Sequence, residues 1–188
     1  MVALRDATES DCASIAQLHA ESWRSAYRGM LSDEYLDTRA HAERAELWRA
    51  RFSESNVNPF FVILAEVDSQ LAGFACVFPN EHAVFGSYVD NLHVAPQLAR
   101  QGIGKRLLAE VGRRLIAEQT PGGVYLWVIE ANTNARRFYS RVGAAEVGFE
   151  EFTMPDGGRV REVRCCWPSP TKLLPTEDQF HRNLRIGA

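Results

Sequence analysis

One segment limits the fold of this 188-residue chain more than any other: a strand that runs through a glycine loop into a helix. It spans residues 92–108 and reads LHVAPQLARQGIGKRLL. Pro96 lacks an amide proton and ends the strand, and Gly102 and Gly104 open the helix. Apolar residues then recur at helical spacing, which predicts one face packed on a sheet. This face consists of Ile103, Leu107, Leu108, Val111, Leu115 and Ile116.

The glycine loop also predicts an anion site. The first amides of a helix have no partner within it and lie at the positive end of its dipole, where phosphate binds. Because they carry no side chain, Gly102 and Gly104 let a phosphate reach these amides. Two commoner phosphate loops do not fit: GxGxxG requires glycine where Leu107 stands, and GxxxxGK[ST] requires glycine at Ala99 and a hydroxyl at Arg106. A tight turn without a ligand is the alternative interpretation.

Hydrophobic periodicity and turn residues predict an α/β chain around this segment. Strands are expected at residues 2–5, 60–67, 71–78, 86–94, 124–129, 145–154 and 159–167. Helices are expected from an N-cap at Thr8 to about residue 27, at 33–52, at 102–116 and at 133–142. We expect one domain over residues 1–167. Residues 168–188 begin with three prolines in eight residues and lack periodicity, which predicts a loosely attached extension.

The composition matches that of soluble globular proteins, with 46% hydrophobic and 24% charged residues. The four cysteines form no CxxC pair and no spaced set with histidine, so we expect neither a metal site nor a disulfide framework. The first residues contain Asp6 and no apolar stretch, and the longest apolar runs are too short to span a bilayer. We therefore expect a cytoplasmic protein without a membrane partner.

Positive charge is concentrated between Ala99 and Arg141. This stretch holds eight basic and three acidic residues, a charge of +5 in a chain whose formal net charge is −3. Nucleic-acid-binding proteins usually carry a larger basic excess together with a recognition motif, so an anionic small molecule is the partner that we expect. A solvated basic helix face is the alternative.

A second segment, residues 128–143, reads VIEANTNARRFYSRVG. Together the two segments resemble the signatures of the GNAT N-acetyltransferase superfamily. The first is similar to its acetyl-CoA-binding motif, usually written Q/R-x-x-G-x-G/A, although Ala99 stands where Gln or Arg is typical. The second, from Asn132 through Ala135, Phe138 and Tyr139 to Gly143, is similar to N-x-x-A-x-x-F/Y-Y-x-x-x-G.

The resemblance covers about Val2 to Trp167 and implies the GNAT fold, an α/β architecture with a mostly antiparallel central sheet splayed between two strands and flanked by helices. It implies acetyl-CoA as the acyl donor and no metal. The donor-binding candidates lie in both motifs. They are Leu92, His93, Val94, Arg100, Gln101, Gly102, Ile103, Gly104, Lys105, Asn132, Ala135, Phe138 and Tyr139.

The resemblance also implies catalytic roles. The backbone N–H of Val94, where the strand splays, would polarise the acetyl carbonyl. Tyr139 would protonate the departing thiolate, because a phenol with a pKa of about 10 is protonated at neutral pH. Packing on a helix face is the alternative role for Tyr139.

The acceptor amine needs a base, because an alkyl ammonium with a pKa of about 10 has no lone pair. By two-residue alternation, Asp90 and Tyr88 share one face of their strand and His93 lies on the other. Several relatives carry an acid at the position of Tyr88, so Asp90 becomes the candidate base here. A structural hydrogen-bonding role for Asp90 stays open.

The N-terminal helices resemble those that wall the acceptor pocket in many bacterial members. Glu21, Trp23 and Tyr27, with Tyr88, are therefore substrate candidates: the aromatic residues as an apolar or cation-stacking wall and Glu21 as an attractor of ammonium. A tryptophan at helical spacing is more often core.

The sequence thus predicts an N-acetyltransferase that transfers acetyl from acetyl-CoA to a primary amine of a small molecule or peptide by direct attack in a ternary complex. A non-catalytic acyl-CoA sensor and an enzyme that uses a longer acyl group are the alternatives. Family members often dimerise, so a homodimer is a further expectation.

Overall fold

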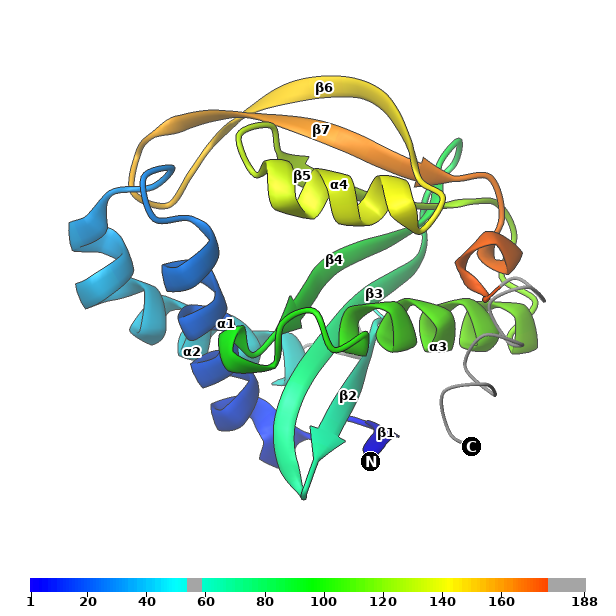
Figure 1. Cartoon of the computed structure of the whole chain (residues 1–188), viewed down its shortest axis with the longest axis horizontal. Coiled ribbons are helices and arrows are strands. Elements are labelled where there is room, and N and C mark those ends of the chain that lie inside the picture. The colour runs from blue at the N-terminus through cyan, green and yellow to red at the C-terminus, as the bar shows by residue number, and fades with distance from the viewer. Residues whose placement is uncertain (54–58, 176–188) are drawn as a thin grey trace.

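A single seven-stranded sheet organises the computed structural model, which describes residues 1–53 and 59–175 (Figure 1). The strands follow the order β1-β2-β3-β4-β5-β7-β6, and every pair is antiparallel except β4–β5. The strands are β1 (Val2–Asp6), β2 (Phe61–Val67), β3 (Gln70–His82), β4 (Gly86–Val94), β5 (Val124–Ile129), β6 (Ala145–Thr153) and β7 (Arg159–Trp167). The α-helices are α1 (Cys12–Ala26), α2 (Ala40–Ser53), α3 (Ile103–Ala117) and α4 (Thr133–Arg141).

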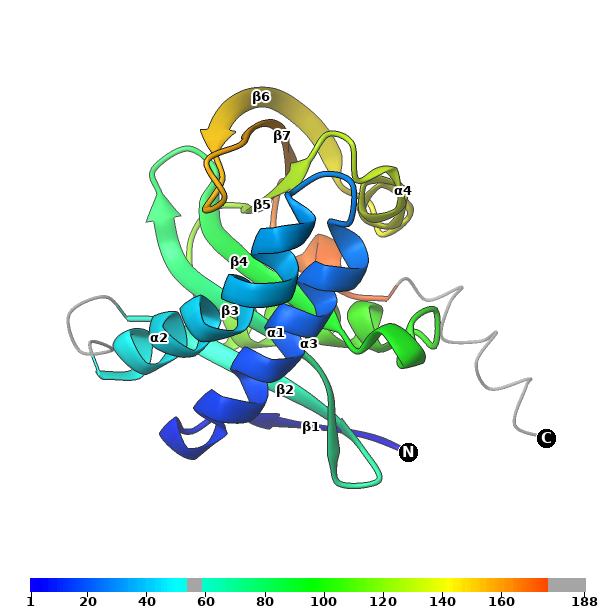
Figure 2. The same cartoon turned by 90° about the vertical axis from the view of Figure 1, so that its left-hand side faces the viewer.

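The sheet is buried on both faces. Alternate residues of β2 divide between two core clusters: Ile63 packs with α3, whereas Leu64 packs with α1 and α2. The view in Figure 2 shows α1 and α2 lying together against one side of the sheet, with α4 on the opposite side. Strands buried on both faces read as continuous apolar runs, which explains the FFVILA stretch.

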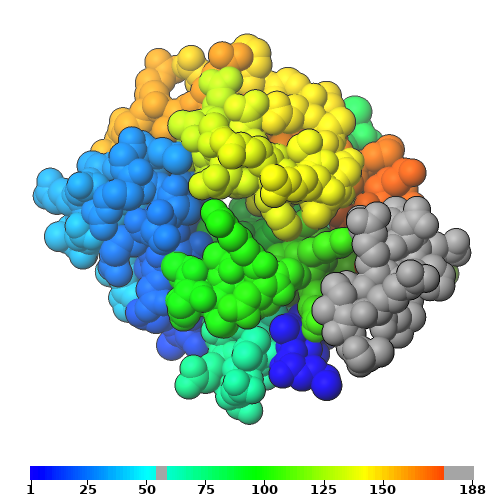
Figure 3. Space-filling view, in the orientation of Figure 1, coloured from blue at the N-terminus to red at the C-terminus, as the bar shows by residue number. Residues whose placement is uncertain are grey.

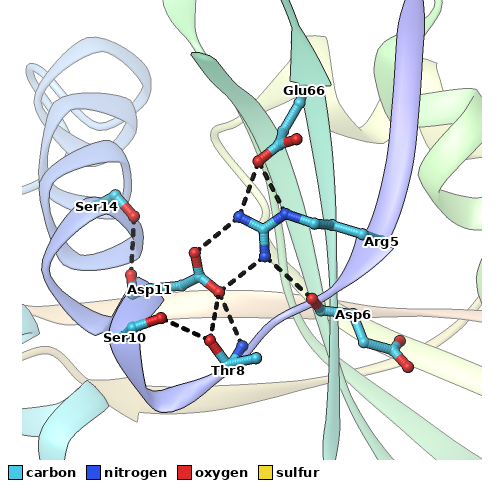
Figure 4. Close-up of polar contacts among 7 residues, drawn as sticks. All are labelled: Arg5, Asp6, Thr8, Ser10, Asp11, Ser14 and Glu66. Carbon is cyan, nitrogen blue, oxygen red and sulfur yellow. Dashed lines mark hydrogen bonds and ion pairs between the residues drawn. The ribbon is translucent and has the colours of Figure 1, made fainter. Parts of the chain in front are cut away.

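A charged cluster fixes the turn from β1 into α1 (Figure 4). Arg5 bonds to both oxygens of Asp11 and to Glu66 on β2, with the closest N–O distances at 2.8 Å. Asp11 also accepts from the backbone N–H of Thr8 at 2.8 Å, which confirms the predicted capping residues. Ionic and capping contacts therefore start the helix.

Strands β4 and β5 separate soon after they meet. They pair only at Ser87–Val124 and Tyr88–Tyr125. At this junction the chains approach so closely that a Cβ on Gly86 would lie 2.1 Å from the carbonyl oxygen of Gly123. Beyond Tyr88 no described strand covers this edge of β4, which confirms the predicted splay between two strands.

Most predicted elements are confirmed, and two helices differ in detail from what was expected. The helix expected at 33–52 begins as a π-helical turn, Tyr35–Arg39, before α2. Ile116, expected in the core stripe of α3, is 40% exposed. No helix in the described ranges is both long and apolar enough to cross a membrane.

The start of the expected C-terminal extension is packed, not loose. Pro170 and Leu173, in a 3-10 turn (Pro170–Leu173), are buried against α3. They lie so close that a Cβ on Gly112 would be 2.8 Å from the oxygen of Pro170. The rest of that extension, 176–188, lies outside the described residues.

Candidate functional site

A hollow lies between the start of α3 and α4. In Figure 3 it opens between the green atoms of the loop before α3 and the yellow atoms of α4. Arg100 and Gly102 adopt positive φ angles of 65° and 80° in this loop, and the first helical bond of α3 runs from Arg106 N to Gly102 O at 3.1 Å. The amides of residues 103 and 104 therefore precede the helical ladder and can bind an anion.

Helix α4 closes the hollow from the other side. A Cβ on Gly104 would lie 3.3 Å from the ring of Phe138, so this glycine also lets the two helices approach. Asn132 caps α4, and its Oδ1 accepts from the N–H of Ala135 at 3.1 Å. Both predicted motifs therefore meet at one cleft, with the Asn132 oxygen used by the helix itself.

Tyr139 lies on the inner side of α4. It is 9% exposed, and its ring packs at 6.2 Å and nearly perpendicular to Trp167. Burial, followed by the nearby Tyr27, holds the pKa of Tyr139 well above its usual value. Its hydroxyl makes no hydrogen bond within residues 1–53 and 59–175, so it remains a protonated donor free to reach a ligand.

The backbone amide of Val94 points into the opening between β4 and β5. The next residue, Ala95, donates its N–H to Ala72 on the β3 side at 2.8 Å. Successive amides of a strand point in opposite directions, so the Val94 N–H faces the uncovered edge of β4. The backbone N–H of Leu92, two residues earlier, points to the same edge.

A β-bulge corrects the predicted alternation along β4. Cys76 and Val77 pair with Asn91 and Val89, which leaves Asp90 as the extra residue. The extra residue reverses the phase, so His93 lies on the same face as Tyr88 and not opposite to it. The ring of His93 lies 4.6 Å from that of His19 on α1.

Asp90 forms an ion pair with an arginine side chain. Its Oδ2 lies 2.6 Å from Nη1 of Arg51 on α2, and both side chains are mostly buried. Tyr88 stacks on Tyr125 at 5.0 Å. Burial, followed by Asp90 and then Glu162, raises the pKa of Tyr88 well above its usual value. Asp90 is therefore both a candidate base and a structural anchor.

Sequence reasoning missed Glu162. This β7 residue lies opposite Ile129 of β5, and Ile129 packs against the N-terminal helical layer. Burial and the charge of Asp90 raise the pKa of Glu162 to about 7. The sequence around residue 162 does not distinguish Glu162, because Asp90, whose charge acts on it, lies 72 positions earlier and two strands away.

The predicted acceptor wall is only partly present. Tyr27, half-buried, faces the site, and burial followed by Glu162 raises its pKa to about 12. Trp23 is 8% exposed and core, with the guanidinium of Arg44 already stacked 4.3 Å above its ring. Glu21 lies on the outward side of α1, bonded to Gln17, so it does not join the site.

The remaining donor candidates surround the loop. Arg100 and Gln101 are exposed, Lys105 is half-buried, and Ile103 is buried beneath them in the α3 core. Within the described part of the chain, no group of three or more His, Cys, Asp or Glu residues is arranged to hold a metal.

Comparison with known proteins decides the family. The profile described as the acetyltransferase (GNAT) family matches residues 14–144. The chain belongs to the GNAT acetyltransferase family. The expected family and fold are confirmed, and the chain is an acyltransferase.

One sequence relative and two solved structures of the same fold illustrate the similarity. The uncharacterized N-acetyltransferase YuaI of Bacillus subtilis is 29% identical over 175 residues, which cover 92% of this chain and 96% of that protein. The fold is similar to that of the PaiA N-acetyltransferase of Thermoplasma acidophilum in complex with coenzyme A, with a TM-score of 0.65, 21% identity and coverage of 86% and 98% of the two chains. It is also similar to the putative acetyltransferase yncA of Salmonella typhimurium with acetyl-CoA, with a TM-score of 0.64, 14% identity and coverage of 89% and 94%.

Proposed function

We propose that the chain transfers acetyl from acetyl-CoA to a primary amine by direct attack in a ternary complex. One observation carries this proposal: the opening between β4 and β5 brings the Val94 amide to a cleft that has the first amides of α3 at one end. Known GNAT structures hold CoA or acetyl-CoA, which supports the same donor here.

The donor would bind by its pyrophosphate on the amides of residues 103 and 104. Gly102 supplies the left-handed turn that aims these amides outward, and Arg100 adds positive charge at the mouth. Phe138 and Ala135 would flank the pantetheine arm along α4. In the reaction, the Val94 N–H would stabilise the oxyanion and the Tyr139 hydroxyl would protonate the thiolate.

A covalent acyl-enzyme is disfavoured by the state of the cysteines. Burial raises the pKa of Cys165 to about 12 and holds those of Cys12, Cys76 and Cys166 above the ordinary thiol value. A thiol that stays protonated at neutral pH is a poor nucleophile. Direct attack by the amine is therefore the simpler route.

The test is release of free CoA from acetyl-CoA over a panel of small amines and amine-bearing peptides. We expect amine-dependent release by the wild type. Tyr139→Phe should lower kcat by roughly 100-fold or more, the usual contribution of a positioned acid, while the dissociation constant for CoA stays unchanged. Equal kcat values for the two proteins would remove Tyr139 from this role. Tight acetyl-CoA binding with no release for any amine would instead favour the acyl-CoA sensor.

A further inference from the structure

Glu162 lies on the acceptor face of the sheet. Its neighbour Val163 is buried in the α3 core, so the alternation of β7 turns Glu162 to the opposite face. Ile129, directly across in β5, packs in the cluster that contains Trp23 and Tyr35. Directly opposed residues of an antiparallel pair share a face, so Glu162 points toward α1 and the turn before α2.

Four titratable groups from three elements converge there. The charges of Glu162 and Asp90 both act on Tyr27 at the end of α1 and on Tyr88 of β4, and Asp90 acts on Glu162 itself. Tyr27 in turn acts on Tyr139, the proposed acid. Glu162 lies across from Ile129 at the far end of β5, on the α1 side of the sheet, so it borders the opening between β4 and β5 where the acyl group would lie.

The two carboxylates differ in their engagement. Asp90 is ion-paired with Arg51 at 2.6 Å. Glu162 makes no ion pair or hydrogen bond through its side chain with any residue of 1–53 or 59–175. A half-buried carboxylate without a partner incurs a desolvation cost that the fold does not offset, which suggests a functional reason for its position.

We propose that Glu162 is the general base that takes the proton from the acceptor ammonium. This inference rests on the proposed acetyl transfer. Glu162 removes one proton, the nitrogen lone pair forms the C–N bond, and the C–S bond breaks. Tyr139 protonates the thiolate, and the second nitrogen proton returns to the Tyr139 phenolate. Glu162 then releases its proton to solvent, so one proton leaves for each turnover.

The environment of Glu162 suits this role. Burial and the negative charge of Asp90 raise its pKa to about 7, and Glu150 of β6, which is ion-paired with Arg164, lies directly opposite it in the sheet. A base is most effective when its pKa lies near the working pH. The ionised form is then available at neutral pH and still accepts a proton.

The test compares three variants by the pH profile of kcat/KM with an active amine. Glu162→Gln should lower kcat/KM by about 100-fold near pH 7 and remove the acidic limb. Its residual activity should rise toward about pH 10, where the free amine needs no base. Asp90→Asn removes the charge that raises the pKa of Glu162, so its acidic limb should move to lower pH and persist. The matched control is Glu151→Gln, an exposed β6 residue paired with Arg159, which should match the wild type.

The outcomes test the base role of Glu162 separately from the proposed acetyl transfer. A Glu162→Gln enzyme with a wild-type profile overturns the role of Glu162 and leaves acetyl transfer intact. Loss of the acidic limb in Asp90→Asn instead of Glu162→Gln assigns the base to Asp90 and also overturns it. Unchanged CoA affinity in every variant would exclude a defect in donor binding. No CoA release from the wild type with any amine overturns both proposals.

Discussion

At the residue scale, the two glycines that open α3, Gly102 and Gly104, have different roles. A Cβ on Gly104 would meet Phe138 at 3.3 Å, so Gly104 sets the distance between α3 and α4. Gly102 has φ of +80° and nothing within 4 Å of a built Cβ. A side chain at 102 would therefore meet a bound ligand before it met the protein, which makes this position a selective probe of the anion site.

Gly102→Leu should weaken CoA binding by at least tenfold, measured by titration calorimetry, because the side chain would cover the amides of residues 103 and 104. The left-handed backbone alone costs about 1–2 kcal/mol in unfolding free energy. Gly157→Leu is the matched control, with φ of +84° and open space in the β6–β7 turn. It should lose similar stability and bind CoA normally. Equal CoA affinities in the two variants would mean that the loop does not hold the pyrophosphate.

At the element scale, the separation of β4 and β5 positions the site. The two strands share two residue pairs and then part, pinned by the close approach of Gly86 and Gly123. The donor-binding motifs are local, so their letters predicted a strand, loop and helix that the structure contains. The acceptor side depends on a bulge at Asp90 and on β7 lying beyond β5, which no local pattern encodes. Strict two-residue alternation along β4 therefore placed His93 on the wrong face, and the sequence did not identify Glu162 as a site residue.

Gly86→Ala should disrupt this junction, because its Cβ would lie 2.1 Å from Gly123 O, within rigid backbone. We expect a loss of about 2 kcal/mol or more in unfolding free energy, read from urea denaturation. Gly148→Ala separates the steric clash from the backbone strain. Its φ of +75° is similar, but no atom lies within 4 Å of a Cβ built at this position. It should lose only the backbone strain. Equal losses would show that the close approach contributes nothing.

At the scale of the whole molecule, an aromatic layer attaches the N-terminal helices to the sheet. His19 is fully buried on α1, accepts from Trp48 Nε1 at 3.2 Å and stacks near His93 of β4. Ser22 contacts His93 Nδ1 at 2.8 Å. Burial lowers the pKa of His93 to about 3 and holds that of His19 well below normal. This aromatic layer therefore requires neutral histidines, and acid should loosen it.

The unfolding free energy should therefore contain an acid-sensitive contribution from His93. Its pKa is lower in the folded chain than the usual 6.5, so below that pH the unfolded chain binds more protons and stability falls, by up to about 1.4 kcal/mol per pH unit. Glu162, with its pKa raised from 4.5 to about 7, has the opposite effect over that window. His93→Gln should flatten the decline measured by urea denaturation between about pH 6 and 4, whereas His41→Gln, exposed on α2, should keep the wild-type slope. Parallel curves for wild type and His93→Gln would mean that His93 is protonated equally in both states.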